Sequence, residues 1–329
     1  MVKQMKPDLS VKIGKLDLKN PVMVASGTFG YAEEFKGFID LKKLGAIVTK
    51  TITIKPRQGN LAPRTCETPA GMLNSIGLEN PGIDKFIKEK LPFLKKLGIP
   101  VIVSIASEDD PGEFSILIKQ LDKISEVSAI ELNISCPNLH KPQGDGLASN
   151  SQSHKNKLIS QDAKDTFALV TAARKLTGKT LITKLSPNIT SISEIALAAE
   201  SAGSDAVALI NTLTGMSIDV DKRAPKIGSW IGGLSGPAIR PVAVKMAWEV
   251  YNKIKIPIIG MGGIMDIQSA LEFFIAGATA ISAGTVNFIN PKASLEIVAG
   301  LKDYLRKNKI KDITGLIGSL KYAAKTYNL

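Results

Sequence analysis

One cysteine stands where a thiol could do acid–base chemistry. Cys136 lies in a loop after a short apolar run, between Ser135 and Pro137, with Asn133 and Asn138 close by. A thiol has an ordinary pKa of about 8.5, and surroundings that bring it near neutrality make it a competent general base. Most free cysteines only pack in cores. The loop position and the two amide side chains favour chemistry, so we predict that Cys136 is catalytic.

Two lysines end apolar runs and could meet an anion. Lys50 and Lys184 each close such a run, where a buried and unpaired ammonium is costly. An anionic partner there would be a carboxylate or the electron-rich edge of a reduced flavin. A lysine that only packs is the simpler alternative, and Schiff-base chemistry is another.

Two glycine-containing loops could hold a phosphate. Gly262-Gly263 and Gly284-Thr285 follow the last two apolar runs of the chain. Glycine lets backbone N–H groups approach an anion closely, and the loops after strands seven and eight form the usual phosphate site of (β/α)8 barrels. Tight turns without a ligand are the alternative. We favour a phosphorylated ligand.

These residues need elements that bring them together. Strand-length apolar runs alternate with stretches of helical periodicity, which is typical of a parallel α/β protein. The eight runs comprise residues 21–25, 46–49, 100–105, 129–132, 181–184, 206–210, 256–259 and 280–283. The expected helices span residues 84–97, 113–124, 161–176, 192–202, 237–254, 267–276 and 291–306. We therefore predict an α/β fold, a (β/α)8 TIM barrel.

In such a barrel the polar residues that follow the strands meet at the carboxyl-terminal face, where ligands bind. Residues 51–80 and 219–233 fit the repeat poorly and contain glycine, proline and charges. We expect them to be excursions over this face. No linker divides the chain, so residues 1–329 are predicted to form a single domain.

Composition excludes several classes of function. Two cysteines and two histidines are too few for a disulfide framework, a zinc site or an iron–sulfur cluster, and Cys66 has no setting like that of Cys136. No apolar run approaches the roughly 18 residues of a membrane span, and no leader is apparent at the start. We expect a cytoplasmic protein.

The charge could suggest nucleic acid, since 42 Lys and Arg against 30 Asp and Glu give +12. The basic residues are mostly scattered, however, and aromatics make up only 5% of the chain and do not alternate with them. We predict no nucleic-acid binding. A basic surface that attracts an acidic protein or anionic metabolites is the favoured interpretation.

Taken together, several motifs resemble the dihydroorotate dehydrogenases over residues 9–321. The cysteine at position 136 is similar to the class 1 enzymes, and residues 215–219 and 232–238 are similar to type 1B. The motifs are Lys50-Thr51, Asn74-Ser75-Ile76-Gly77-Leu78-Glu79-Asn80-Pro81-Gly82, Asn133-Ile134-Ser135-Cys136-Pro137-Asn138, Asn211-Thr212, Gly232-Gly233-Leu234-Ser235-Gly236-Pro237-Ala238 and Gly260-Met261-Gly262-Gly263-Ile264.

The resemblance implies FMN-dependent oxidation of (S)-dihydroorotate to orotate in UMP synthesis, with a hydride passing from C6 to FMN and Cys136 removing the C5 proton. Lys50 is implied to face both the substrate carboxylate and the flavin. The implied substrate residues are Lys50, Asn74, Ser75, Ile76, Gly77, Leu78, Asn133, Asn138, Asn211 and Thr212. The implied FMN residues are Ala25, Ser26, Lys50, Thr51, Ser104, Asn133, Lys184, Ile210, Gly236, Gly262, Gly263, Gly284 and Thr285.

The electron acceptor is expected on another chain. No strand is followed by an intact G-x-G-x-x-G fingerprint, so NAD would be reduced elsewhere. The resemblance implies a homodimer that joins an iron–sulfur flavoprotein subunit, with FAD and [2Fe-2S], in a heterotetramer.

Three departures from the family pattern stand out. Ser104 replaces a usual asparagine, residues 139–157 form a longer and more polar loop, and Ser282-Ala283 replaces a usual Gln-Val. Two alternatives stay open. One is another FMN barrel, such as a dihydropyrimidine dehydrogenase-like enzyme, and the other is a non-catalytic flavin-binding subunit.

Overall fold

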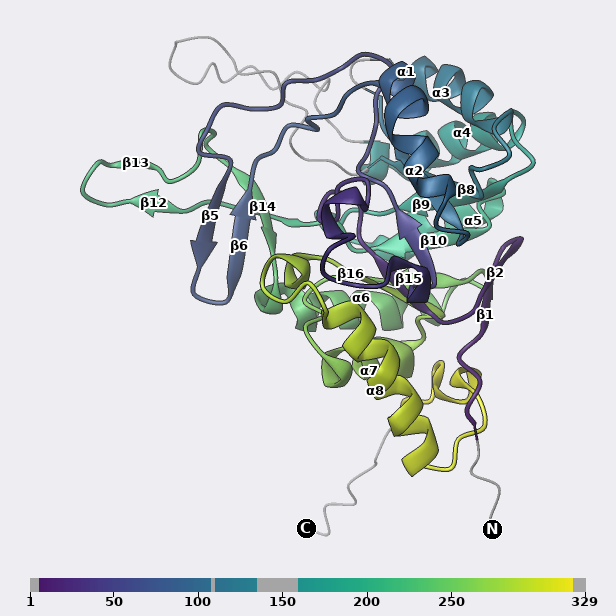
Figure 1. Ribbon diagram of the computed structural model, residues 1–329. Coiled ribbons are helices and arrows are strands. Elements are labelled where there is room, and N and C mark those ends of the chain that lie inside the picture. The colour runs from purple at the N-terminus through teal and green to yellow at the C-terminus, as the bar shows by residue number, and fades with distance from the viewer. Residues whose placement is uncertain (1–5, 108–109, 135–158, 322–329) are drawn as a thin grey trace.

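In the computed structural model, which describes residues 6–107, 110–134 and 159–321, eight parallel strands close into a barrel (Figure 1). They follow one another around it in chain order. The strands are β3 (Val22–Val24), β4 (Ala46–Val48), β7 (Val101–Ile105), β8 (Ala129–Asn133), β9 (Thr180–Lys184), β10 (Ala206–Leu209), β15 (Ile258–Gly260) and β16 (Ala280–Ala283). Each of the eight apolar runs overlaps one strand, so the predicted (β/α)8 barrel is confirmed.

Side chains of each strand alternate between the barrel interior and the surrounding helices. On β8, Ile130 and Leu132 pack in the same apolar cluster as Leu117 of α3 (Gly112–Asp122) and therefore point outward. Glu131 and Asn133, which alternate with them, point into the barrel. All five side chains of β8 are buried, in agreement with a strand covered on both faces.

Helices cover the outside of the barrel close to the predicted positions (Figure 1). They are α3, α4 (Ala163–Arg174), α5 (Ile192–Ser201), α6 (Arg240–Tyr251), α7 (Ile267–Ala276) and α8 (Ala293–Lys307). No helix in the described ranges joins the length and the apolar character that a bilayer crossing demands.

One predicted helix is interrupted. Residues 84–97 were expected to be continuous, but the chain forms α1 (Ile83–Lys85), a π-helical turn (Phe86–Lys90) and α2 (Leu91–Lys95). Pro92 stands in the first turn of α2. Because proline has no N–H to donate to the preceding turn, the regular α-helical bonding cannot run through this point.

An amino-terminal hairpin, which the sequence pattern did not reveal, precedes the barrel. Strands β1 (Val11–Ile13) and β2 (Leu16–Leu18) pair antiparallel and bury alternate side chains in the same cluster as the barrel interior. The backbone N–H of Lys15, in the hairpin turn, donates to Thr180 Oγ1 at the start of β9, 2.9 Å away. The hairpin therefore covers the amino-terminal end of the barrel.

The two predicted excursions pair with each other. Strands β5 (Thr65–Thr68) and β6 (Gly71–Asn74) come from the first, and β14 (Gly232–Ser235) is where the second ends. With β11 (Leu213–Gly215) they form one sheet in the order β11-β14-β6-β5. A second hairpin, β12 (Ile218–Asp219) with β13 (Ala224–Pro225), extends beyond it, and Figure 1 shows this group projecting to one side.

Candidate active site

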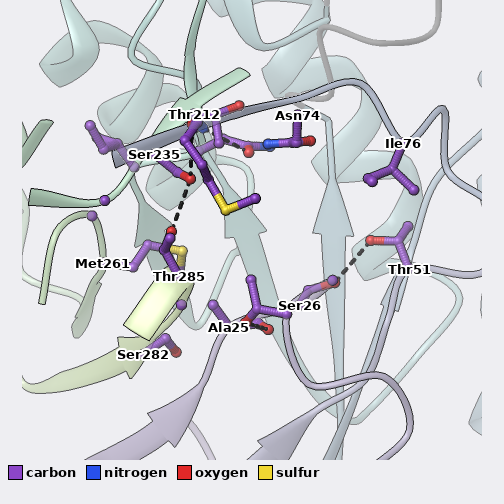
Figure 2. A pocket seen from close by; sticks show the side chains of 18 of the residues that line it. Ala25, Ser26, Thr51, Asn74, Ile76, Thr212, Ser235, Met261, Ser282 and Thr285 are labelled. Carbon is purple, nitrogen blue, oxygen red and sulfur yellow. Dashed lines mark hydrogen bonds between the residues drawn. The ribbon is translucent and has the colours of Figure 1, made fainter. Parts of the chain in front are cut away.

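A cavity opens at the carboxyl-terminal ends of the barrel strands, between them and the excursion sheet (Figure 2). In Figure 2, Ala25, Ser26 and Ser282 lie on the barrel side, and Asn74 and Thr212 lie on the opposite side. Most of the predicted site residues line this cavity: Ala25, Ser26, Lys50, Thr51, Asn74, Ile76, Gly77, Leu78, Asn133, Lys184, Ile210, Asn211, Thr212, Gly236, Gly262, Gly263, Gly284 and Thr285. The strand-end residues thus meet as expected.

Four predicted site residues are not among these lining residues. Cys136 and Asn138 lie outside the described residues. Ser75 is 1% exposed, and its hydroxyl accepts a hydrogen bond from Asn60 Nδ2 at 2.6 Å. Ser104 is fully buried behind Thr51. Direct ligand contacts of Ser75 and Ser104 stay predictions, and the structure gives both a supporting position.

Thr51 is the centre of a hydrogen-bonded group under the cavity. Its hydroxyl shares hydrogen bonds with the hydroxyls of Ser26, at 3.0 Å, and Ser104, at 2.9 Å. It also accepts one from Asn133 Nδ2 at 3.0 Å, and Asn133 Oδ1 accepts one from Asn211 Nδ2 at 3.5 Å. These bonds fix the orientation of both asparagines before any ligand arrives.

The cavity is cationic. Its described lining includes two lysines and no aspartate or glutamate. Lys184 is 5% exposed at the end of β9, and its ammonium makes no hydrogen bond or ion pair within the described ranges. Such a cation is expensive to bury, so an anionic ligand beside it would be stabilising.

Backbone N–H groups at the ends of β15 and β16 form a second polar feature. Across the described ranges, those of Gly262, Gly263, Gly284 and Thr285 donate to no protein acceptor. Gly263 has a φ of +78°, and a Cβ there would lie 2.8 Å from the carbonyl oxygen of Gly236, so this turn requires glycine. The arrangement suits an oxyanion such as a phosphate.

Several lining residues were missed from the sequence. Met72 and Ser235 come from β6 and β14, and the Ser235 hydroxyl accepts a hydrogen bond from Thr285 Oγ1 at 2.9 Å. Ser282, noted only as a departure, also lines the cavity, and its hydroxyl is buried without a partner in the described structure. The barrel pattern carries no signal for the excursion strands, although Ser235 lies within the quoted 232–238 motif.

Comparison with known proteins identifies the family. The family model described as dihydroorotate dehydrogenase matches residues 8–305. Three relatives share the name dihydroorotate dehydrogenase B (NAD(+)), catalytic subunit. The one from Trichlorobacter lovleyi is 51% identical over 96% of this chain and 99% of its own length. Those from Geobacter sulfurreducens and Thermoanaerobacter sp. (strain X514) are each 49% identical, over 96% and 95% of this chain and 99% of their own lengths. The chain therefore belongs to the dihydroorotate dehydrogenase family.

Proposed function

We propose that this chain oxidises (S)-dihydroorotate to orotate in the synthesis of UMP. The observation that carries the proposal is one cavity that joins a recess lined by lysine and asparagine to a row of N–H groups. These N–H groups have no acceptor in the part of the chain that the structure describes. The names of relatives 49% to 51% identical to the chain support the same activity.

The recess suits the substrate's chemistry. Dihydroorotate has ring amides, carbonyl groups and one carboxylate. An asparagine offers both a donor and an acceptor to such an edge, and Asn74, Asn133 and Asn211 all line the cavity. The side-chain Nδ2 of Asn74 donates to the carbonyl oxygen of Gly233 at 3.1 Å, and the Oδ1 of Asn74 therefore points away from that carbonyl. Lys50 would attract the carboxylate.

Cys136 would hold the thiolate that removes the C5 proton. As the proton leaves, the C5–H bond breaks. The electron pair of that bond forms the C5=C6 double bond while the C6–H bond breaks. A hydride, with two electrons, leaves C6. Bound FMN would supply the acceptor for that hydride.

The structure fits FMN at two places. The N–H groups of Gly262, Gly263, Gly284 and Thr285 would donate to the phosphate oxygens. Lys184 would place its ammonium where negative charge collects on the reduced ring. The remaining lining residues that we assign to the ring are Ala25, Ser26, Thr51, Ile210 and Gly236.

Alanine at position 284 tests the phosphate cradle. A Cβ on Gly284 would have Ala25 Cβ, 3.7 Å away, as its nearest neighbour, so the fold tolerates it. It would, however, crowd the N–H groups around the phosphate. We expect Gly284→Ala to weaken FMN binding about tenfold or more, the order expected for disturbing a hydrogen bond to a charged group. Fluorescence titration of the apoprotein measures it.

Gly37→Ala is the matched control, since Gly37 is exposed and its added Cβ would meet nothing within 4 Å. Equal FMN affinity in the two variants would contradict the role of Gly284 in binding the FMN phosphate.

For the acceptor we propose NAD, reached through a second subunit that carries FAD and a [2Fe-2S] cluster. The relatives' names contain both "NAD(+)" and "catalytic subunit", and this chain has only two cysteines to offer a cluster. We further propose that two copies of the chain form a homodimer within a heterotetramer. The cytoplasmic location stays a prediction.

Turnover with competing substrates tests the function. The FMN-loaded protein should reduce an artificial dye with dihydroorotate much faster than with dihydrouracil, because only dihydroorotate presents a carboxylate to Lys50. Faster turnover with dihydrouracil would favour the dihydropyrimidine dehydrogenase-like alternative. A colourless protein that takes up no FMN would contradict both. Reduction of NAD by the isolated chain, without an added iron–sulfur flavoprotein, would overturn the partner proposal.

A further inference from the structure

A buried carboxylate lies beneath the cavity. Glu131, in the middle of β8, is 2% exposed, and its Oε1 has no hydrogen-bond partner within the described ranges. Its register neighbours are Ser104 on β7 and Ile182 on β9. Ile182 is apolar, and the Ser104 hydroxyl bonds to Thr51 instead. An unsatisfied charged oxygen is costly in such a place, and it therefore requires an explanation.

Strand register brings this carboxylate near the cavity lysine. Asn133 pairs in register with Lys184, and Glu131 precedes Asn133 by two residues on the same inward-facing side of β8. Glu131 and Lys184 are thus offset by two residues on adjacent parallel strands. Such strands lie about 4.8 Å apart and rise about 3.3 Å per residue, so two long side chains can approach each other across this offset. Glu131 occupies the layer below, and Lys184 lines the cavity above it.

A carboxylate and an ammonium that lie close together lower the cost of burying each other. Neither side chain makes an ion pair at 4.0 Å or less within the described ranges, so the lysine ammonium remains available to a ligand in the cavity. A carboxylate below it would counter part of its positive charge and hold the side chain between the barrel interior and the ligand.

We propose that Glu131 is a positioning residue that acts through Lys184 and lowers the midpoint potential of the bound flavin. The proposal rests on FMN occupying the cavity as argued above. Reduced flavin gains negative charge, which Lys184 stabilises. By partly compensating Lys184, Glu131 limits that stabilisation and keeps the reduced cofactor ready to pass its electrons on.

Glu131→Gln tests this, because glutamine keeps the shape and removes the charge. We expect the variant to bind reduced FMN more tightly relative to oxidised FMN by about tenfold, which for a two-electron couple raises the potential by about 30 mV. Dye-equilibrated spectroscopic titration measures the potential. Glu194→Gln, the same change at an exposed position on α5, is the control and should leave it unchanged.

The same change in a Lys184→Met background separates a role through the lysine from a direct field on the flavin. Without the ammonium, Glu131 has no lysine charge to compensate. Glu131→Gln should then change the ratio of reduced to oxidised FMN affinity by less than about twofold. Glu131→Asp, which keeps the charge, should stay near wild type.

Two outcomes would overturn the proposal: a wild-type potential in Glu131→Gln, or an equal shift in both backgrounds. Should Glu131→Gln not fold, Glu131→Leu with Lys184→Met removes both charges and should have the same potential as Lys184→Met alone. A different potential would contradict the role of Glu131 through Lys184. The FMN content of the wild-type protein reports separately on the proposed function.

Discussion

Cys136→Ala is expected to slow the reduction of FMN by dihydroorotate about 10²-fold or more, which is the rate contribution expected of a positioned general base. The C5 proton must leave as the C6 hydride does, and the methyl group of alanine cannot accept it. Anaerobic stopped-flow spectroscopy, which follows the loss of oxidised-flavin absorbance after mixing with dihydroorotate, isolates this step from the later transfer of electrons.

Cys66→Ala is the control that the chain itself provides. Cys66 lies on β5, is partly exposed, and is not among the residues lining the cavity. Its replacement removes the other thiol and should leave the reduction rate unchanged. FMN content and dihydroorotate affinity should also stay close to wild type in Cys136→Ala. A wild-type reduction rate in that variant would take the base role away from Cys136.

The sequence predicted the barrel well because its strands are short and buried on both faces. Residues 129–132, for example, are apolar except for Glu131 and can be recognised as a strand without knowledge of its partners. Strand β8 extends them by only one residue, to Asn133. The residue that follows such a run is then placed at the carboxyl-terminal face by the fold alone. Lys50, Lys184 and Gly284 reach the cavity for this reason.

Features that depend on pairing between distant segments were not predictable in this way. The sheet that joins β6 to β14 pairs Asn74 with Gly233, 159 residues later in the chain. Neither strand has a sequence pattern that identifies the strand with which it pairs. Glu131 was missed for a related reason. From the sequence alone, a single glutamate within an apolar run cannot be assigned to a layer of the barrel interior. Only the register of β8 with β9 shows that Glu131 lies one layer below Lys184.

Methionine at Lys184 is expected to lower the flavin midpoint potential by roughly 30 to 60 mV, a tenfold to hundredfold weaker relative binding of the reduced form. Methionine keeps an unbranched side chain of similar length but has no positive charge to stabilise the electron-rich ring. The same dye-equilibrated titration measures the shift. Lys175→Met, at an exposed position after α4, removes a lysine charge from the surface and should leave the potential unchanged.

Folding stability gives this prediction a second test. Lys184 is only 5% exposed and makes no ion pair within the described ranges. Its buried ammonium should therefore lower the free energy of unfolding of the apoprotein. In the Glu131→Gln background, where no carboxylate is left without its lysine, Lys184→Met should therefore keep or raise the Tm of the apoprotein while it lowers the potential of the holoprotein. A large fall in Tm together with an unchanged potential would mean that the lysine holds the barrel together. A higher Tm together with a lower flavin potential would show that the Lys184 charge destabilises the fold and stabilises the reduced ligand.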